Sequence, residues 1–154
     1  MKVIKIAVFA ITLVVGVMFF TLYKNGAHLF DTPGFAYRLT TFLTTNSAMT
    51  ADDHAFKELR TPVYSVNAED LYKRVIYAAT ELGWEVIVHD SDNQNVNFVV
   101  RSPVFLFEDD VYVQVQFIDM DHSSLYIQSS SRKGGADFAA NSGHIQALMK
   151  KMIK

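Results

Sequence analysis

The feature that most constrains this chain is an uncharged, apolar run near its N-terminus, Ile6–Tyr23. An α-helix rises 1.5 Å per residue, so about 20 residues cross the ~30 Å hydrocarbon core of a bilayer. A helix satisfies its backbone hydrogen bonds internally and is therefore the simplest structure that can span lipid. The run predicts one transmembrane helix, and we expect residues 1–24 to form an N-terminal membrane anchor.

The alternative interpretation of this run is a cleavable signal peptide, since Lys2 and Lys5 resemble the basic start of one. Cleavage requires small residues after the apolar segment, whereas residues 19–24 are bulky and largely aromatic. We therefore expect an uncleaved anchor. Lys2, Lys5 and the terminal amine outnumber Lys24 and Arg38, which favours a cytoplasmic N-terminus. The predicted location is the bacterial inner membrane, with the C-terminal domain periplasmic or otherwise extracytoplasmic.

Composition narrows the function of the rest of the chain. None of the 154 residues is cysteine, which excludes a disulfide scaffold, a thiol nucleophile and a zinc finger. Residues 1–24 hold three of the 14 basic residues and none of the 16 acidic ones, so the remainder is acidic overall. A nucleic-acid-binding domain normally has the opposite sign. We expect no nucleic-acid partner.

Residues 25–57 are expected to form an arm that contains an amphipathic helix and a linker. The sequence at residues 31–33, Asp-Thr-Pro, is typical of a helix start. Apolar residues then recur at helical spacing on one stripe: Phe35, Leu39, Phe42 and Leu43. Arg38 is expected elsewhere on that helix, and residues 44–57 are typical of a polar linker. The segment 31–46 fits two positions, on the outer leaflet or docked on the domain.

The domain itself is predicted over residues 58–154. A short edge strand precedes Asn67, which is a favourable helix cap, and Gly83 is expected to end the helix that follows. Four segments then alternate apolar and polar residues: 84–89, 96–100, 111–117 and 125–130. Asp137 is expected to open a last amphipathic helix. The order predicts an α+β, two-layer fold, in which two helices cover one face of an antiparallel sheet of four to five strands, preceded by one transmembrane helix.

Several short motifs of the domain resemble those of a known family. They are Leu82-Gly83-Trp84, Arg101-Ser102-Pro103 with Phe105 and Phe107, Asp109-Asp110-Val111, and Ser129-Ser130-Ser131-Arg132 with Gly134, Asp137, Asn141 and Ile145. In this spacing the chain resembles the bacterial and plastid family called domain of unknown function 1499. Arg38-Leu39 and Glu58-Leu59-Arg60 resemble the arm of some members. The resemblance implies a fold and an envelope location, and it brings no established activity.

A group of polar residues at strand ends and in loops is the strongest candidate for a site. Its members are Arg101, Asp109, Asp110, Arg132, Asp137 and Asn141. As a binding site, the two arginines would hold an anion beside the helix that Asp137 opens. As a structural network, Arg132 would pair with Asp110 or Asp137, and Arg101 with Asp109. We favour the structural network, because the acids and bases nearly balance.

An apolar run inside a strand connection is a candidate contact segment: Phe105, Leu106 and Phe107. The run would either fill the core or form the lip of a groove for lipid or a partner. Exposed apolar patches mark contact sites, but filling the core is the simpler interpretation.

Two other residue combinations fall short of a catalytic or metal site. Ser129 and Ser131 lie in a predicted strand, without the glycine-flanked elbow that a serine nucleophile requires. Asp119, Asp121 and His122 could bind a cation, but Asp in a turn usually bonds its own backbone, and no further ligand lies nearby in the sequence. We expect no catalytic residue, no metal site and no cofactor.

These observations predict a membrane-anchored envelope protein whose outer domain is a non-enzymatic binding or accessory module. Its expected partners are the membrane, through Ile6–Tyr23, and an envelope protein. Two alternatives stay open. One is a hydrolase or other enzyme that uses Arg101, Asp109 and Arg132. The other is an accessory subunit of a membrane complex that acts through the arm and the Phe105–Phe107 segment.

Overall fold

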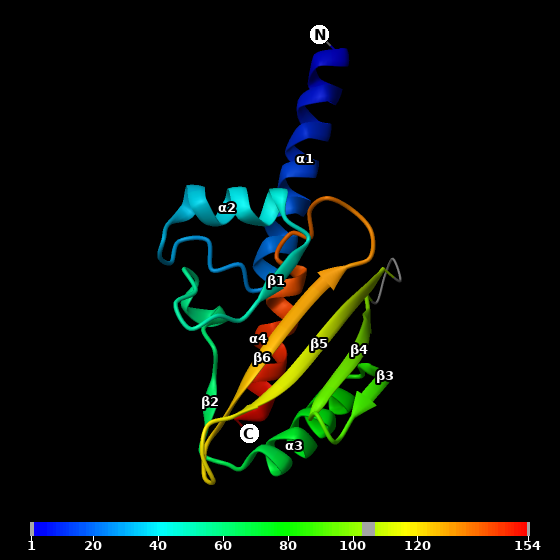
Figure 1. Cartoon of the computed structure of the whole chain (residues 1–154). Coiled ribbons are helices and arrows are strands. Elements are labelled where there is room, and N and C mark those ends of the chain that lie inside the picture. Colours follow the sequence, from blue (N-terminus) through cyan, green and yellow to red (C-terminus); the bar gives the residue numbers. More distant parts are fainter. Residues whose placement is uncertain (1, 103–106, 154) are drawn as a thin grey trace.

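The computed structural model describes residues 2–102 and 107–153 and shows a long helix standing on an α+β domain (Figure 1). The helices are α1 (Lys2–Lys24), α2 (Phe35–Thr44), the short 3-10 helix η1 (Lys57–Leu59), α3 (Ala68–Glu81) and α4 (Ala140–Met152). The strands are β1 (Ser47–Met49), β2 (Val63–Tyr64), β3 (Glu85–Asp90), β4 (Asn95–Arg101), β5 (Glu108–Phe117) and β6 (Ser123–Ser131). Helix α1 is long and apolar enough to cross a membrane.

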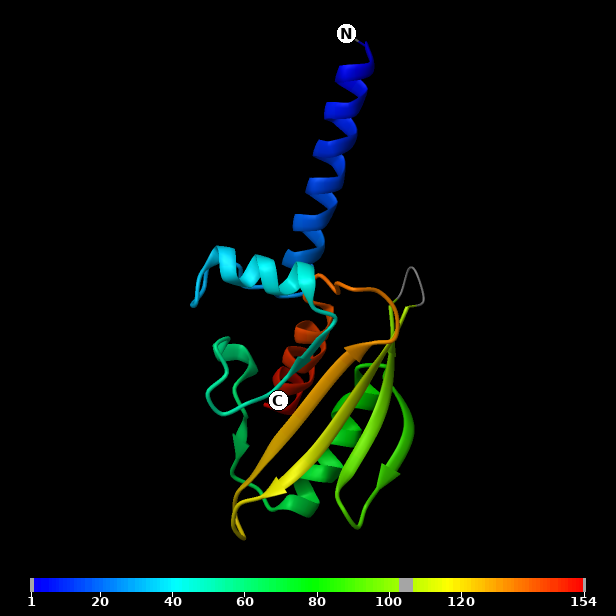
Figure 2. The ribbon, with the colours of Figure 1, turned by 45° about the horizontal axis from the view of Figure 1, so that its top comes forward.

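One antiparallel sheet forms the centre of the domain. Its strand order is β1-β6-β5-β4-β3, and β2 pairs with the same edge of β6 as β1 does. Helices α3 and α4 pack on one face, and among the described elements none covers the other face (Figure 2). The predicted α+β fold with two helices on one face of an antiparallel sheet is confirmed. The sheet is open, and within the described residues it has six strands, where four to five were expected.

Alternation along the strands builds the core between sheet and helices. Apolar residues of one parity are buried: Val111, Val113, Val115, Leu125 and Ile127. The same rule fails in β3, where strict alternation would place Val88 on the same face as Trp84 and Val86. A bulge between Val86 and Val88 shifts the register with β4, so Val88 turns outward and is exposed.

Helix α3 begins and ends as its sequence predicts. The side chain of Asn67 accepts a hydrogen bond from the backbone N–H of Asp70 at 2.9 Å, which caps the first turn. Gly83 follows the helix with φ +78°, a left-handed conformation that glycine adopts without steric cost. Leu71 and Val75 are fully buried against the sheet, as the amphipathic pattern indicates.

Helix α2 differs from its prediction in start and in buried face. It begins at Phe35, after Gly34, and residues 31–33 lie outside it. Its buried residues are Arg38 and Phe42, whereas Phe35 stays exposed. The prediction placed Arg38 away from the packed side. That placement is wrong, because the guanidinium turns inward to reach carbonyl oxygens of the preceding connector and the carboxylate of Glu58.

Residues 47–49, expected in a polar linker, form strand β1 on the edge of β6. The sequence Ser-Ala-Met lacks the alternating apolar pattern of a strand, so pairing with β6 decides its structure. Phe42 and Phe56 of the arm belong to the same core as the domain. The division of the chain at residues 24 and 57 stays a prediction, but the arm is packed on the domain.

The last turns of α1 are also part of this core. Leu22 is fully buried, and Met18 packs against the same cluster. The connector that follows is tied to α4 and to the residues just before it: Asn25 Nδ2 donates to the carbonyl of Phe138 at 2.9 Å, and Gln146 Nε2, midway along α4, donates to that of Gly26 at 3.1 Å. Helix α1 and the domain are therefore joined by packed contacts as well as by the chain.

Candidate functional site

The predicted polar residues separate into two groups on opposite faces of the sheet. The first group is an exposed ladder of ion pairs across β3, β4, β5 and β6. Arg101 pairs with Glu85 and with Glu108, the latter at 3.0 Å. Arg132 pairs with the same Glu108 and with Asp110, the latter at 2.7 Å. Both arginines are thus occupied by carboxylates of this chain.

The pairing of Arg132 with Asp110 is one of the two predicted for it, but the predicted pairing of Arg101 with Asp109 is wrong. Arg101 lies opposite Glu108 in the β4–β5 register, and Asp109 lies opposite Val100. Successive strand residues face opposite sides, so Asp109 points to the helix-covered face with Val111. There its Oδ2 lies 2.9 Å from Nε2 of His144 in α4.

The second group is a buried hydrogen-bond network at the start of α4. Asn141 is its centre and is fully buried. Its Nδ2 donates to Asp137 at 2.6 Å and to Ser131 at 2.9 Å, while its Oδ1 accepts from Ser129 at 2.6 Å. Asp137 also accepts from the backbone N–H of Ala139 and Asn141. The prediction that Asp137 opens the helix is wrong by three residues, because α4 begins at Ala140 with Ala139 in the left-handed conformation at the N-cap position.

The carboxyls of Asp109, which is buried, and Asp137, which is half-buried, have pKa values shifted in opposite directions. Burial raises the pKa of Asp109, but hydrogen bonds from His144 and Ser131 outweigh it, and the pKa lies below its ordinary value. Burial also raises the pKa of Asp137, and here the hydrogen bonds from Asn141 offset only part of the rise. Asp137 therefore takes up a proton at a higher pH than an ordinary Asp does.

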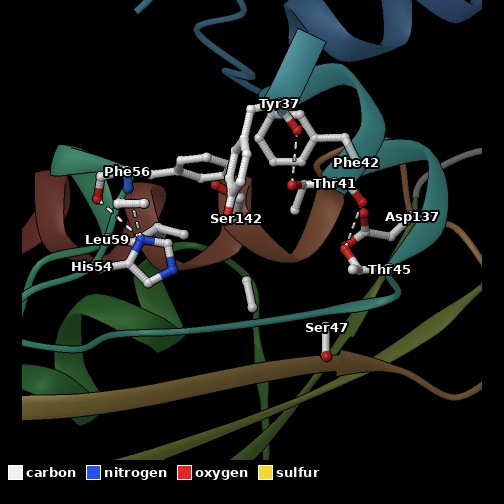
Figure 3. Close-up of a pocket in the computed structure, with 12 residues that line it drawn as sticks. Tyr37, Thr41, Phe42, Thr45, Ser47, His54, Phe56, Leu59, Asp137 and Ser142 are labelled. Atoms are coloured by element: carbon white, nitrogen blue, oxygen red, sulfur yellow. Dashed lines mark hydrogen bonds between the residues drawn. The ribbon is translucent and has the colours of Figure 1, made fainter. Parts of the chain in front are cut away.

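Asp137 also lines a cavity of about 250 Å³ between α2, the β1–η1 segment and α4. Figure 3 shows the surrounding side chains, which come from parts of the chain far apart in sequence. The residues that line it are Tyr37, Thr41, Phe42, Thr45, Ser47, Ala48, His54, Ala55, Phe56, Leu59, Asp137 and Ser142. The aromatic wall is ordered by ring contacts, with Phe56 at 6.0 Å from Tyr37 and 5.4 Å from Phe42 between ring centroids.

The serine and Asp-His combinations have structural partners. Ser129 and Ser131 lie in β6 and bond Asn141. In the β5–β6 hairpin, His122 Nδ1 lies 2.9 Å from Asp119 Oδ1, and Asp119 also accepts the backbone N–H of Asp121. Within residues 2–102 and 107–153, no group of three or more His, Asp or Glu side chains is placed to hold a metal ion.

The predicted apolar contact segment is only partly described. Phe105 and Leu106 lie outside the described residues. Phe107 is exposed and precedes β5, and its backbone N–H and carbonyl both bond Ser102. These bonds close the connection between β4 and β5 at its base.

The profile of the family described as "Protein of unknown function (DUF1499)" matches residues 38–152. The chain belongs to the DUF1499 family. The match begins at Arg38 in α2 and ends at Met152 in α4, so most of the cavity wall and the Asn141 network lie inside the DUF1499 unit. No curated protein matches this DUF1499 chain. It is similar to a Thermobifida fusca protein solved by solution NMR, with TM-score 0.41 and 8% identity over 70% of this chain and 82% of that one.

Proposed function

We propose that this DUF1499 protein is a single-pass membrane protein whose domain lies outside the cytoplasm and binds a small molecule without transforming it. The observation that carries the proposal is the cavity beneath α2. Its wall combines apolar and aromatic side chains with about as many hydroxyl, imidazole and carboxyl groups, and a concave site of this mixed kind can bind a small molecule. Its volume of about 250 Å³ lies just below the ~300–1,000 Å³ of drug-sized pockets, which favours a small ligand or one end of a larger one.

The lining favours a ligand with an apolar body and one hydrogen-bonding group. Phe42, Phe56 and Leu59 offer apolar surface, and all three are buried. Asp137 and Ser142 lie on the α4 side of the cavity. A carboxyl whose pKa is raised by burial accepts a hydrogen bond when ionised and donates one when protonated.

A non-enzymatic role is supported by the way the charged side chains are used. Arg101 and Arg132 are bound by carboxylates of neighbouring strands on the uncovered face, away from the cavity. His144 is bound to Asp109. An enzyme at the Arg101/Asp109/Arg132 cluster would need these groups to converge on one space, whereas Asp109 faces the opposite side of the sheet.

The membrane part of the proposal is supported by α1 and by its contacts. The helix is 23 residues long, and its apolar surface is exposed except where the last turns meet the domain. Lys2 and Lys5 favour an N-terminus in the cytoplasm. The domain would then lie directly against the outer face of the membrane, because Leu22 is buried in its core.

The ligand proposal is tested by native mass spectrometry of the full-length protein released from its own membranes in mild detergent. We expect a co-purified small molecule on the wild type and its loss in Ala48→Phe, which fills the cavity. Ala36→Phe, on the exposed side of α2 outside the cavity, is the matched control and should retain the molecule. An empty wild type that no small amphipathic compound stabilises against heat would contradict the proposal.

A second candidate function, an accessory subunit of a membrane complex, is favoured by the uncovered face of the sheet. Tyr112 and Tyr126 lie there with ring centroids 6.3 Å apart, and tyrosine is enriched at protein interfaces. A photocrosslinker at Tyr126 should give one discrete adduct in native membranes, while the same group at Tyr77, exposed on α3, should give none. Equal crosslinking at both positions would remove this candidate.

A further inference from the structure

We infer that α2 and the connector before it lie in the interface of the outer leaflet, with the stacked rings of Phe30 and Phe35 among the lipids. The inference rests on the proposed role of α1 as a membrane anchor. It adds a second lipid contact, made by the domain side of the protein, and its partner is the lipid surface itself.

The first argument is the length of α1 that is free of the domain. Met18 and Leu22 pack into the core, so the free, uncharged part runs only from Ile6 to Val17. These roughly 12 residues span about 18 Å, against a hydrocarbon core of ~30 Å. A shortfall of this size would require strong thinning of the bilayer. If the bilayer is not thinned, α1 can cross it only when the residues up to Tyr23 also lie within the hydrocarbon core. These residues include the turns that lie against the domain.

The second argument is the position of α2 beside those turns. Phe42 of α2 and Leu22 of α1 belong to one buried cluster, with Met18 packed against it. Figures 1 and 2 both show α2 crosswise to α1, beside the C-terminal end of α1, where that helix meets the domain. A helix crosswise to a membrane span, and level with its outer end, lies in the plane of the membrane surface.

The third argument is what α2 and the connector expose. Phe30 is 86% exposed, and its ring stacks on that of Phe35 at 5.5 Å between centroids. Aromatic rings are favoured at the level of the lipid headgroups. The single charged residue of α2, Arg38, is fully buried and paired with Glu58. Helix α2 therefore places no charge against lipid. In the connector, the exposed carboxylate of Asp31 lies 3.8 Å from His28 and belongs at the level of the polar headgroups.

Together these arguments assign both positions that the sequence left open for the segment 31–46. It is docked on the domain through Arg38 and Phe42, which are buried, and it lies on the outer leaflet through its first residue, the exposed Phe35, together with Phe30 of the connector. Lipid contact uses the first turn of α2 and docking uses the turns that follow, so neither excludes the other.

The test measures tryptophan quenching by brominated lipids, with full-length protein in vesicles. Phe30→Trp reports on the connector. Val14→Trp reports on the span, and Phe117→Trp reports on the β5–β6 hairpin at the far end of the sheet (Figure 1). The native Trp84 is buried and contributes the same background to every variant. Two lipids are compared, one brominated near the headgroup and one near the chain end.

We expect the introduced indole of Phe30→Trp to be quenched mainly by the shallow bromines and that of Val14→Trp mainly by the deep ones. The indole of Phe117→Trp should be quenched by neither. If Val14→Trp is quenched and Phe30→Trp is not, the interfacial position of α2 is wrong while the anchor stands. If the unquenched indole of Phe30→Trp also has blue-shifted emission, a protein surface rather than lipid covers this residue. If Val14→Trp is not quenched, α1 does not span the bilayer, and both the anchor and this inference fall.

Discussion

Arg38 and Glu58 form the ion pair that fastens the arm to the domain, with Nη1 to Oε1 at 2.5 Å and Nη2 to Oε2 at 3.1 Å. The guanidinium is fully buried and lies 4.3 Å from the centre of the Phe56 ring. It also donates to the carbonyl oxygens of Ala27 and Thr32. One side chain thus joins the connector, α2 and η1.

Arg38→Ala should destabilise the domain strongly. The substitution leaves a part-buried carboxylate and several carbonyl oxygens without a donor, and breaking a buried ion pair costs about 3–5 kcal/mol. Arg38→Lys should recover little, because an ammonium group cannot reproduce the fork of the guanidinium. The measurement is the free energy of denaturant unfolding of the full chain in detergent. A lysine variant as stable as the wild type would show that charge alone matters here.

The Glu58 side of the pair predicts a pH dependence. Burial raises the pKa of this carboxyl, but the hydrogen bonds and charge of Arg38 outweigh it and lower the pKa below the ordinary value of 4.5. A lowered folded-state pKa contributes stability that is present above pH 4.5 and is lost as the pH falls through the folded-state value. Wild type should therefore exceed Glu58→Gln in stability at neutral pH, and the difference should vanish in acid. A constant difference across that range would contradict the ion pair.

Arg132 is expected to matter much less for stability than Arg38. Its side chain is 42% exposed, and its partners Glu108 and Asp110 stay hydrated when it is removed. Arg132→Ala should shift the thermal midpoint far less than Arg38→Ala does, measured side by side. Equal losses in thermal midpoint would contradict this expectation and would show that the exposed ion pairs stabilise the domain as strongly as the buried pair does.

Gly143 tests the packing of the connector after α1 on α4. Alanine normally stabilises a helix interior by about 1 kcal/mol relative to glycine. Here a Cβ would lie 2.9 Å from the carbonyl oxygen of Asn25, so the connector must move. Gly143→Ala should therefore lower the thermal midpoint and expose residues 25–34 to protease. Gly135→Ala, where a Cβ meets nothing within 4 Å, is the control and should leave both unchanged.

Much of the fold was predictable because local patterns and packing agree. The alternation along β5 and β6 and the apolar stripe of α3 each follow from one buried face. The ends of α3 are set locally, by Asn67 at its start and Gly83 after its end. The same alternation indicates that Asp109 faces inward, because Asp109 has the same parity as the buried Val111. The expected pairing of Asp109 with Arg101 did not take this into account. The bulge at Val88 and the strand at residues 47–49 depend on pairing with partners distant in the chain, which no local pattern contains.

The candidate site was less predictable for the same reason. The polar residues singled out from the sequence do cluster in pairs, but the sheet divides them between two faces. The cavity is assembled from α2, the β1–η1 segment and α4, and none of these carries a motif for it. Arg38 was assigned to the wrong side of α2, since the buried acceptors that hold it become visible only once the connector has folded.

The most direct test of the proposed function is the topology of the protein in the membrane. The chain contains no cysteine, so a single introduced thiol reports its own side of the membrane. We expect Met120→Cys, at the exposed tip of the β5–β6 hairpin, to react with a membrane-impermeant maleimide on intact spheroplasts. Lys2→Cys should react only after the membrane is permeabilised. Labelling of Lys2→Cys from outside with Met120→Cys protected, or release of the domain from the membrane by salt, would contradict it.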